Sequence, residues 1–269
     1  MKLFKITSPT VAQVPIIISV PHAGTRLPSE LKKHYKKGMR RHLDDTDWFV
    51  HRLYEFAPSL GITLIKANLS RWVIDLNRSP ESIPLYSDDR LITPNTPTTD
   101  FYGNPLYKSK ELEPDKDEVA RRLQGYYRPY HQQVAQLLEE RKKTFGQVLL
   151  WDAHSIRHRV STIQKDPFPD MILGNNDERT AHPKLIRTAL KGLNSGRFEV
   201  HHNHPFKGGH ITRSFGKPEN GVHALQLEMN KILYMDDNEL TYNEDRASKV
   251  QKVLRTTLEG LIKTMEHSL

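Results

Sequence analysis

The sequence predicts an α/β fold, a mixed and mostly parallel sheet flanked by helices. Three observations favour it: short apolar runs recur along the 269 residues, helix-like stretches separate several of them, and polar side chains stand directly after the runs. A chain of this length can bury one large core. We therefore expect a single domain over residues 1–269.

Six runs have the length and apolar content of buried strands. They are PIIISV, GITLIKANL, QVLLWDAH, DMILGN, FEVHHN and VHALQLEMN. The segment DDTDWFVHRLYEFAPSL has apolar side chains at roughly helical spacing and predicts the first crossover helix. Further helices are expected from about Glu111 to Phe145, kinked or divided at Pro129, and from about Tyr242 to Glu266.

The segment between Arg78 and Glu111 is rich in proline and has no clear period. An irregular segment of this length is uncommon inside a compact domain unless it covers a site or binds a ligand. We predict that residues 79–114 form a lid or substrate loop over an active site.

Composition excludes several classes of protein. The chain has no cysteine, which excludes disulfides and thiol catalysis and leaves His, Asp and Glu as metal ligands. No apolar run is long enough for a membrane span or a signal peptide, so we expect a cytoplasmic protein without membrane contact. The sequence carries no indication of the oligomeric state.

The net charge of +8 has two interpretations, because a basic surface attracts nucleic acids and small anionic substrates alike. The one dense basic run, LKKHYKKGMRRH over residues 31–42, lacks the interleaved aromatic residues that would stack on bases. A solvated face explains it more simply. A nucleic-acid-binding protein is therefore a remote alternative, and we expect no nucleic-acid partner.

Polar residues follow the apolar runs at four places. His22 follows IIISVP, the DLNR segment with Asn77 and Arg78 follows ANLSRWVI, His154 follows QVLLWDA, and Glu228 lies late in HALQLEMN. Open α/β sheets bind ligands at the carboxyl ends of their strands. One histidine after a strand is most often a structural hydrogen-bonding group, but four such sites together indicate an active site.

Two imidazoles and one carboxylate form the usual ligand set of a hydrolytic zinc site. HLDDTDW offers Asp44, Asp45 and Asp47 as the acid, although acidic residues opening a helix also act as caps. Each imidazole should pass its other N–H to an acceptor. For His154 we consider Asp152 an unlikely acceptor, because it points to the same side of the strand but one layer deeper.

The remaining polar groups are expected to have different roles, one in proton transfer and the others in substrate binding. Burying the carboxylate of Glu228 in an apolar strand is unfavourable unless the group is paired or functional. In amide hydrolysis Glu228 could act first as general base and then as general acid. Asn77 and Arg78 suit a substrate carboxylate, with a loop salt bridge as the alternative. Residues 202–216, HNHPFKGGHITRSFG, bring Lys207, Arg213 and two glycines into one probable loop that is either an anion-binding loop or merely mobile.

Seven segments together resemble the N-formylglutamate amidohydrolase family, in order and over most of the chain. They are SVPHAGTRLP, DDTDWFVHRLYEFAPSLG, VIDLNR, YYRPYH, DAHS, HNHPFKGGHITRSFG and VHALQLEMN. The resemblance implies hydrolysis of N-formyl-L-glutamate to formate and glutamate, a step of histidine breakdown. It also implies a fold similar to that of the zinc carboxypeptidases and aspartoacylase.

The wider resemblance implies roles for particular residues. His22 and His154 resemble the two metal-binding histidines, Asn77 and Arg78 the carboxylate-binding pair, and Glu228 the catalytic glutamate. The related enzymes have a glutamate ligand three residues after the first histidine, where this chain has Thr25. For that ligand we choose Asp45, with Asp47 in reserve.

Zinc is the expected ion, and another divalent transition metal would also suit the ligand set. The implied substrate is a small anion derived from an amino acid. Arg78 should hold one of its carboxylates and Arg213, with Lys207 or Arg71, the other. A deacylase or carboxypeptidase-like hydrolase for a different N-acyl amino acid is the alternative, because acyl size cannot be inferred from the loop.

Overall fold

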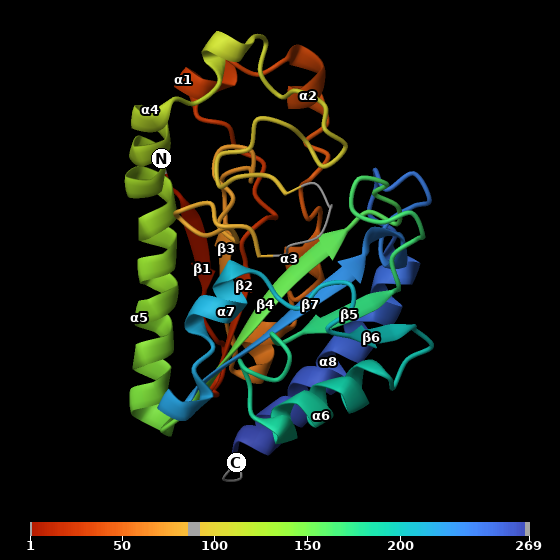
Figure 1. Ribbon diagram of the computed structural model, residues 1–269. Helices are drawn as coiled ribbons and strands as arrows, with labels where there is room; N and C mark the ends of the chain where they lie inside the picture. Colours follow the sequence, from red (N-terminus) through yellow and green to blue (C-terminus); the bar gives the residue numbers. More distant parts are fainter. Residues whose placement is uncertain (1, 86–91, 267–269) are drawn as a thin grey trace.

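The computed structural model describes residues 2–85 and 92–266, built around a seven-stranded sheet (Figure 1). The strands are β1 (Phe4–Thr7), β2 (Ile16–Val20), β3 (Thr63–Ala67), β4 (Val148–Ile156), β5 (Met171–Gly174), β6 (Val200–His202) and β7 (Val222–Asn230). Their order is β1-β3-β2-β4-β7-β5-β6. The β1–β3 and β5–β7 pairs are antiparallel and the other pairs are parallel, which confirms the mixed, mostly parallel sheet.

All six strands expected from the apolar runs are present. The short edge strand β1 was not predicted, because its residues are partly exposed and carry no continuous apolar run. Alternate side chains of the central strands enter different cores. Ile16 and Ile18 of β2 pack in one core and Ile17 in the other. Both faces of the sheet are therefore covered, as continuous apolar runs require.

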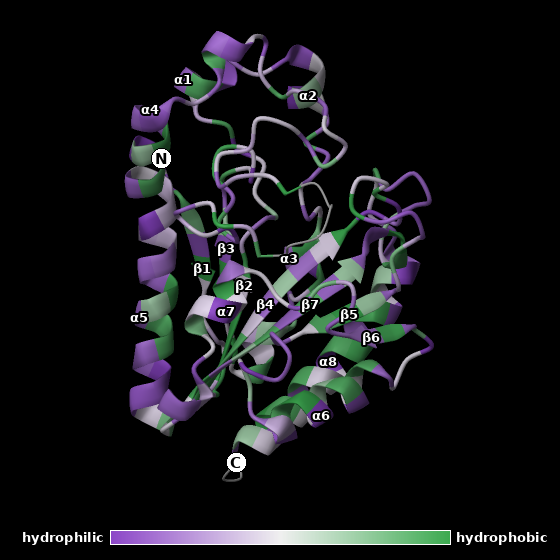
Figure 2. Cartoon of the chain, in the orientation of Figure 1, coloured by the Kyte–Doolittle hydropathy of each residue, from purple (hydrophilic) through white to green (hydrophobic). Residues whose placement is uncertain are grey.

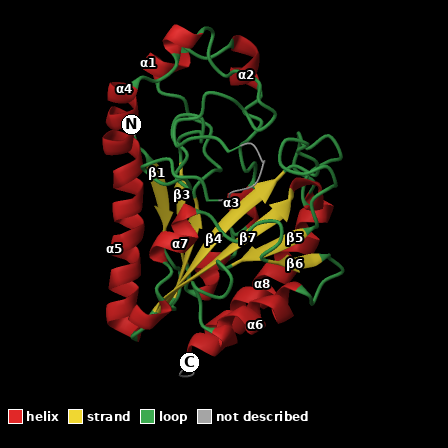
Figure 3. Cartoon of the chain, in the orientation of Figure 1, coloured by secondary structure: helices red, strands yellow, loops and turns green. Residues whose placement is uncertain are grey.

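Two groups of helices flank the sheet, and α1 (Ser29–Lys32) and α2 (Lys37–Arg41) lie apart from it (Figure 3). The other helices are α3 (Val50–Leu53), α4 (Lys116–Arg122), α5 (Arg128–Phe145), α6 (Pro183–Leu193), α7 (His210–Phe215) and α8 (Glu244–Glu266). Residues of α5 and α7 share a core with Ile17, while α6 and α8 share the other core with Ile16. The outer side of α5 is hydrophilic, as a helix between core and solvent requires (Figure 2).

The long helix is divided as expected, although the division takes an unexpected form. A π-helical turn, Leu123–Tyr127, separates α4 from α5, and Pro129 lies in the first turn of α5. Proline has no N–H to donate to the preceding turn, which agrees with the irregular π-helical hydrogen bonding just before it. The last helix, α8, begins two residues later than predicted and ends at the predicted residue.

The prediction of one crossover helix over DDTDWFVHRLYEFAPSL is wrong. That segment contains turns, the four-residue α3 and a short 3₁₀ helix, Ala57–Leu60. Phe49 adopts a left-handed conformation with φ of 61°, and the backbone N–H of Asp47 donates to the carbonyl of His22 over 3.0 Å. The acidic residues therefore lie in a loop tied to the end of β2.

Loops collect beyond the carboxyl ends of β4 and β7 (Figure 1). They include the described parts of the predicted lid, while its residues 86–91 lie outside the described residues. No helix in the described part of the chain combines the length and hydropathy needed to cross a membrane.

Candidate active site

Three neighbouring strands supply the centre of the site. His22 lies two residues beyond β2, His154 is on β4 and Glu228 is on β7. β4 pairs with both other strands, and His154 is directly opposite Glu228 in the β4–β7 register. The parallel strand ends thus bring together side chains that are about 70 to 200 residues apart in the sequence.

His22, Asp47 and His154 form a buried cluster whose candidate ligand atoms all lie within 4.8 Å of one another. An Asp47 oxygen, Oδ2, is 3.1 Å from His154 Nδ1 and 3.7 Å from His22 Nδ1. His22 Nδ1 and Asp47 Oδ1 are buried without hydrogen-bond partners. Such atoms are costly unless something satisfies them, and a divalent cation at their centre would do so.

The opposite ring nitrogens also face carboxylates. His22 Nε2 lies 2.9 Å from Asp75 Oδ1, and His154 Nε2 lies 3.1 Å from Asp152 Oδ2. The expectation that Asp152 is an unlikely partner is wrong: residues two apart on one strand are neighbours on the same face, within reach of an imidazole that turns back along the strand. Carboxylates behind histidines are the usual outer support of metal ligands.

The choice of Asp45 as acidic ligand is corrected in favour of Asp47. Asp45 Oδ2 accepts a hydrogen bond from Trp72 Nε1 over 2.8 Å, and Oδ1 accepts one from the Phe101 backbone N–H over 3.2 Å. Burial raises the pKa of Asp45 to about 6. Its carboxylate therefore anchors two loops and does not join the cluster.

Further contacts hold the loop that carries Asp47. Arg157 Nη1 donates to both carboxylate oxygens of Asp44 over 2.7 Å, and Arg157 Nε donates to Glu239 over 2.5 Å. Lys231, only 2% exposed, donates from Nζ to the Asp44 carbonyl over 3.1 Å. These partners are far from Asp44 in the sequence and could not be predicted from it.

Charges around the cluster are nearly all paired. Arg71 donates to Asp75 over 2.7 Å, and its guanidinium lies 4.6 Å from the centre of the Phe101 ring. Burial acts to raise the pKa of Asp75, but Arg71 and His22 outweigh it and hold that pKa well below its usual value. Burial would lower the pKa of His154, but Asp152 and Asp47 raise it well above normal.

Glu228 differs from these carboxyl groups. Burial raises its pKa to about 8, with Asp47 and Asp152 adding to the shift and His154 opposing it. Its one hydrogen bond within the described residues comes from Gln226 Nε2 over 3.4 Å. A carboxyl group with a pKa near neutrality can both accept and return a proton.

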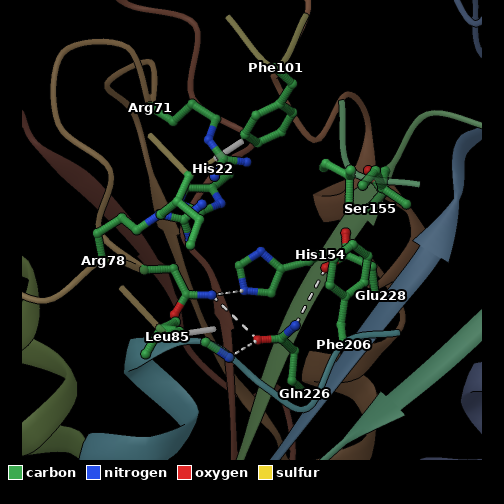
Figure 4. Close-up of a pocket in the computed structure, with 15 residues that line it drawn as sticks. His22, Arg71, Arg78, Leu85, Phe101, His154, Ser155, Phe206, Gln226 and Glu228 are labelled. Atoms are coloured by element: carbon green, nitrogen blue, oxygen red, sulfur yellow. Dashed lines mark hydrogen bonds between the residues drawn. The ribbon is translucent and has the colours of Figure 1, made fainter. Parts of the chain in front are cut away.

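One cavity contains most of the predicted site residues (Figure 4). Its polar lining is His22, Arg71, Asn77, Arg78, His154, Ser155, Gln226 and Glu228. Leu85, Ile92 and Phe101 reach it from the predicted lid, and Ile156, Ile163 and Phe206 complete an apolar wall. The described part of the predicted lid thus lines the cavity.

Asn77 and Arg78 both line the cavity but are held differently. Asn77 Oδ1 accepts a hydrogen bond from the Ile211 N–H over 2.8 Å, and its Nδ2 lies 3.2 Å from His154 Nε2. Arg78 Nε donates to the Thr93 carbonyl over 3.0 Å, and the side chain is 20% exposed. Asn77 therefore also fixes the start of α7, while Arg78 is the more accessible group.

Lys207 and Arg213, both predicted to bind substrate, do not line this cavity. Lys207 forms a surface ion pair with Asp177 over 2.9 Å, and Arg213 Nε donates to the Gly208 carbonyl over 2.8 Å. Their loop instead contributes Phe206 and Gly209. A Cβ at Gly209 would lie 2.2 Å from Asn77 Nδ2, so the close approach requires glycine.

Comparison with known proteins agrees with this arrangement. A family model described as N-formylglutamate amidohydrolase matches residues 14–235. An N-formylglutamate deformylase of Pseudomonas aeruginosa is 41% identical over 253 residues, with 93% of each chain covered. A deformylase of the same name from Pseudomonas putida is 39% identical over 261 residues, with 96% of each covered.

Solved structures share the fold. The crystal structure of an N-formylglutamate amidohydrolase from Ralstonia eutropha JMP134 superposes with a TM-score of 0.83 at 26% identity, covering 98% of both chains. A gene product of Agrobacterium tumefaciens has a TM-score of 0.76 at 18% identity, covering 99% of this chain and 97% of its own. At that identity the second likeness concerns the fold alone.

Proposed function

Because the chain belongs to the N-formylglutamate amidohydrolase family, we propose that it hydrolyses the formyl amide of N-formyl-L-glutamate to formate and L-glutamate. The observation that carries the proposal is one cavity lined by both histidines of the His–Asp–His cluster, by a carboxyl group of raised pKa and by two guanidinium groups. A place in histidine breakdown, in the cytoplasm, is part of the proposal and is supported by the family resemblance.

His22, Asp47 and His154 are proposed to hold a zinc ion. Two imidazoles and a carboxylate suit zinc best among the common divalent metals, and a bound cation would satisfy the buried unpaired atoms of His22 and Asp47. When bound, such an ion supplies Lewis acidity to the formyl oxygen and acidifies water. Asp75 and Asp152 orient the two imidazoles from behind.

Glu228 is proposed as the group that moves the proton. It stands beside His154 at the cavity wall, where its carboxylate takes the proton of the attacking water. As the C–N bond breaks, Glu228 donates that proton to the leaving amine. The balance is one water consumed and one formate and one amine formed.

Two arginines are proposed to recognise the dianionic substrate. Arg78 offers a guanidinium at the cavity wall, suited to a carboxylate. Of the three cations expected for the second carboxylate, Arg71 lines the cavity, whereas Lys207 and Arg213 do not. Arg71 is buried and held by Asp75, so its position is fixed before the substrate arrives.

A second candidate substrate class is favoured by one observation, the apolar wall of Ile156, Ile163 and Phe206. Such a wall could also accept an acyl group larger than formyl. The test is a panel of N-formyl, N-acetyl and longer N-acyl derivatives of glutamate and aspartate, measured as kcat/KM with the zinc-loaded enzyme. We expect N-formyl-L-glutamate to be preferred. A preference for a long acyl chain, or for substrates without an α-carboxylate, would contradict the proposal.

Glu228→Gln provides the matched control for this panel. The variant keeps the shape of the side chain but cannot accept a proton. We expect it to retain zinc and to lose turnover on every substrate by roughly a thousandfold. Ordinary turnover in this variant would remove Glu228 from the mechanism.

A further inference from the structure

A second cleft lies beside the segment that leads away from His22. It is lined by Thr25, Arg26, Leu27, Lys32 and Arg40 and has a volume of about 380 Å³. The lining thus contains three cations, one hydroxyl and no carboxylate. Every charged group of this basic cleft is a hydrogen-bond donor, which is the composition expected of an anion site.

Hydrogen bonds of the surrounding chain hold the segments that carry Arg26, Lys32 and Arg40. The Arg26 N–H donates to the Asn68 carbonyl and the Ser70 N–H donates to the Arg26 carbonyl, each over 3.0 Å. Lys32 ends α1 and Arg40 lies in α2. Tyr35, which joins the two helices, is fully buried and donates from its hydroxyl to the Trp72 carbonyl over 2.8 Å. Three separate segments therefore hold the cleft in one shape.

The cations of the cleft lack protein partners. In the described parts of the chain, the side chains of Arg26, Lys32 and Arg40 form no hydrogen bond or ion pair. Arg40 Nε is buried and has no acceptor. Three like charges around one cleft repel each other, and a buried guanidinium N–H without an acceptor is unfavourable. An anion in the cleft would relieve the repulsion among the three cations.

We propose that the basic cleft binds a small oxyanion with two or more negative charges, of the phosphate and pyrophosphate class. The Thr25 hydroxyl supplies a directed donor, and Arg26, Lys32 and Arg40 supply charge. The site is independent of the proposed hydrolysis. It also gives a role to part of the basic run over residues 31–42, which the active site does not use.

Single-stranded nucleic acid fits this cleft less well. Its lining has no aromatic side chain on which a base could stack. Other cations of the same run, Lys36 and Lys37, lie outside the lining, so the positive groups do not form a track along a phosphate backbone. The geometry favours a compact anion.

The test uses calorimetric titration of the full chain with pyrophosphate, inorganic phosphate, AMP and a short single-stranded DNA at constant ionic strength. Arg40→Gln removes a lining cation, and Lys37→Gln removes an exposed cation of the same run from outside the lining. We expect pyrophosphate to bind the wild type and Lys37→Gln equally and Arg40→Gln roughly tenfold more weakly. Arg40→Lys, which keeps the charge but not the guanidinium group, should fall between them.

The comparison of ligands identifies the source of the phosphate. Equal affinities for phosphate and AMP indicate a site for the free ion, and tighter AMP binding indicates a phosphate carried on a larger metabolite. If Arg40→Gln does not fold by circular dichroism, Lys32→Gln, at an exposed position, replaces it. Equal weakening by Lys37→Gln, unchanged binding to Arg40→Gln, absence of binding, or tighter binding of single-stranded DNA than of pyrophosphate would overturn the proposal.

Discussion

Two kinds of imidazole in this protein have opposite surroundings. His22 and His154, with ring centres 5.0 Å apart, are surrounded by Asp47, Asp75 and Asp152. His131 lies in α5, stacked on the Tyr127 ring with centres 4.1 Å apart. Its Nε2 is 2.9 Å from the Leu76 carbonyl, and the Phe215 ring is stacked near it with centres 5.8 Å apart.

The difference shows how environment assigns a role to histidine. Asp152 and Asp47 raise the pKa of His154, whereas burial and Arg71 lower the pKa of His22 although Asp75 and Asp47 oppose them. The carboxylates around the pair therefore favour a metal ion between the two rings more than a proton on each of them. Burial lowers the pKa of His131 to about 4, so its ring stays neutral at physiological pH. It supports the strand-end loop that carries Arg78 through packing and one hydrogen bond.

The largest expected effect comes from removing each kind of imidazole. His22→Ala should lower zinc affinity by more than about a hundredfold and abolish turnover while leaving the fold intact. His131→Ala should keep zinc in each folded molecule but lose about 2–3 kcal/mol of stability. Zinc content and urea unfolding of both variants measure the contrast. If His22→Ala unfolds the protein with its metal content per folded molecule unchanged, His22 is structural.

A smaller effect should appear in the pH dependence of stability. The pKa of His131 is about 4 when folded, below its reference value of 6.5, so between these values the unfolded chain binds more protons. Stability should therefore fall as the pH drops from about 7.5 to 5, by about 2 kcal/mol through this residue. Urea unfolding of His131→Gln should give a flatter profile than the wild type. Parallel profiles would show that His131 titrates normally.

The smallest of these effects on zinc affinity is expected from Asp152, which contacts the His154 ring nitrogen that faces away from the cluster. Asp152→Asn keeps an oxygen near His154 but removes the negative charge, so zinc affinity should fall about tenfold without loss of the site. Competition with a chelator measures the change, with Asp166→Asn, an exchange at an exposed position, as the charge control. An affinity equal to the wild type would mean that Asp152 does not support His154.

Much of the fold could be predicted from the sequence because burial leaves a direct pattern. The continuous apolar runs of β2, β4 and β7 predicted a sheet that is covered on both faces. The polar residues that follow these runs indicated where the strands end. The helix expected after Asp47 failed because a left-handed residue, Phe49, and a hydrogen bond to the end of β2 bend the chain. Those constraints come from tertiary contacts, and they produce no periodic pattern of apolar residues in the sequence.

The residues of the candidate active site could be predicted only where they lie on a strand or at its end. Asp45 and Asp47 are both acidic and two residues apart, and the structure distinguishes them through the partners of Asp45, Trp72 and the Phe101 N–H. Asp75 was not singled out, although it belongs to the DLNR segment. Which cation of residues 202–216 reaches the cavity depends on loop geometry, and neither Lys207 nor Arg213 does.

The central claim is that His22, Asp47 and His154 together hold the metal ion. The most direct measurement is an anomalous difference map at the zinc edge from crystals grown with zinc. We expect one strong peak at about 2.0–2.2 Å from a nitrogen of each imidazole and from an Asp47 oxygen. The peak should persist in crystals of Asp45→Asn and disappear in Asp47→Asn. A peak bound by Asp45, or no peak at the cluster in the wild type, would contradict the account.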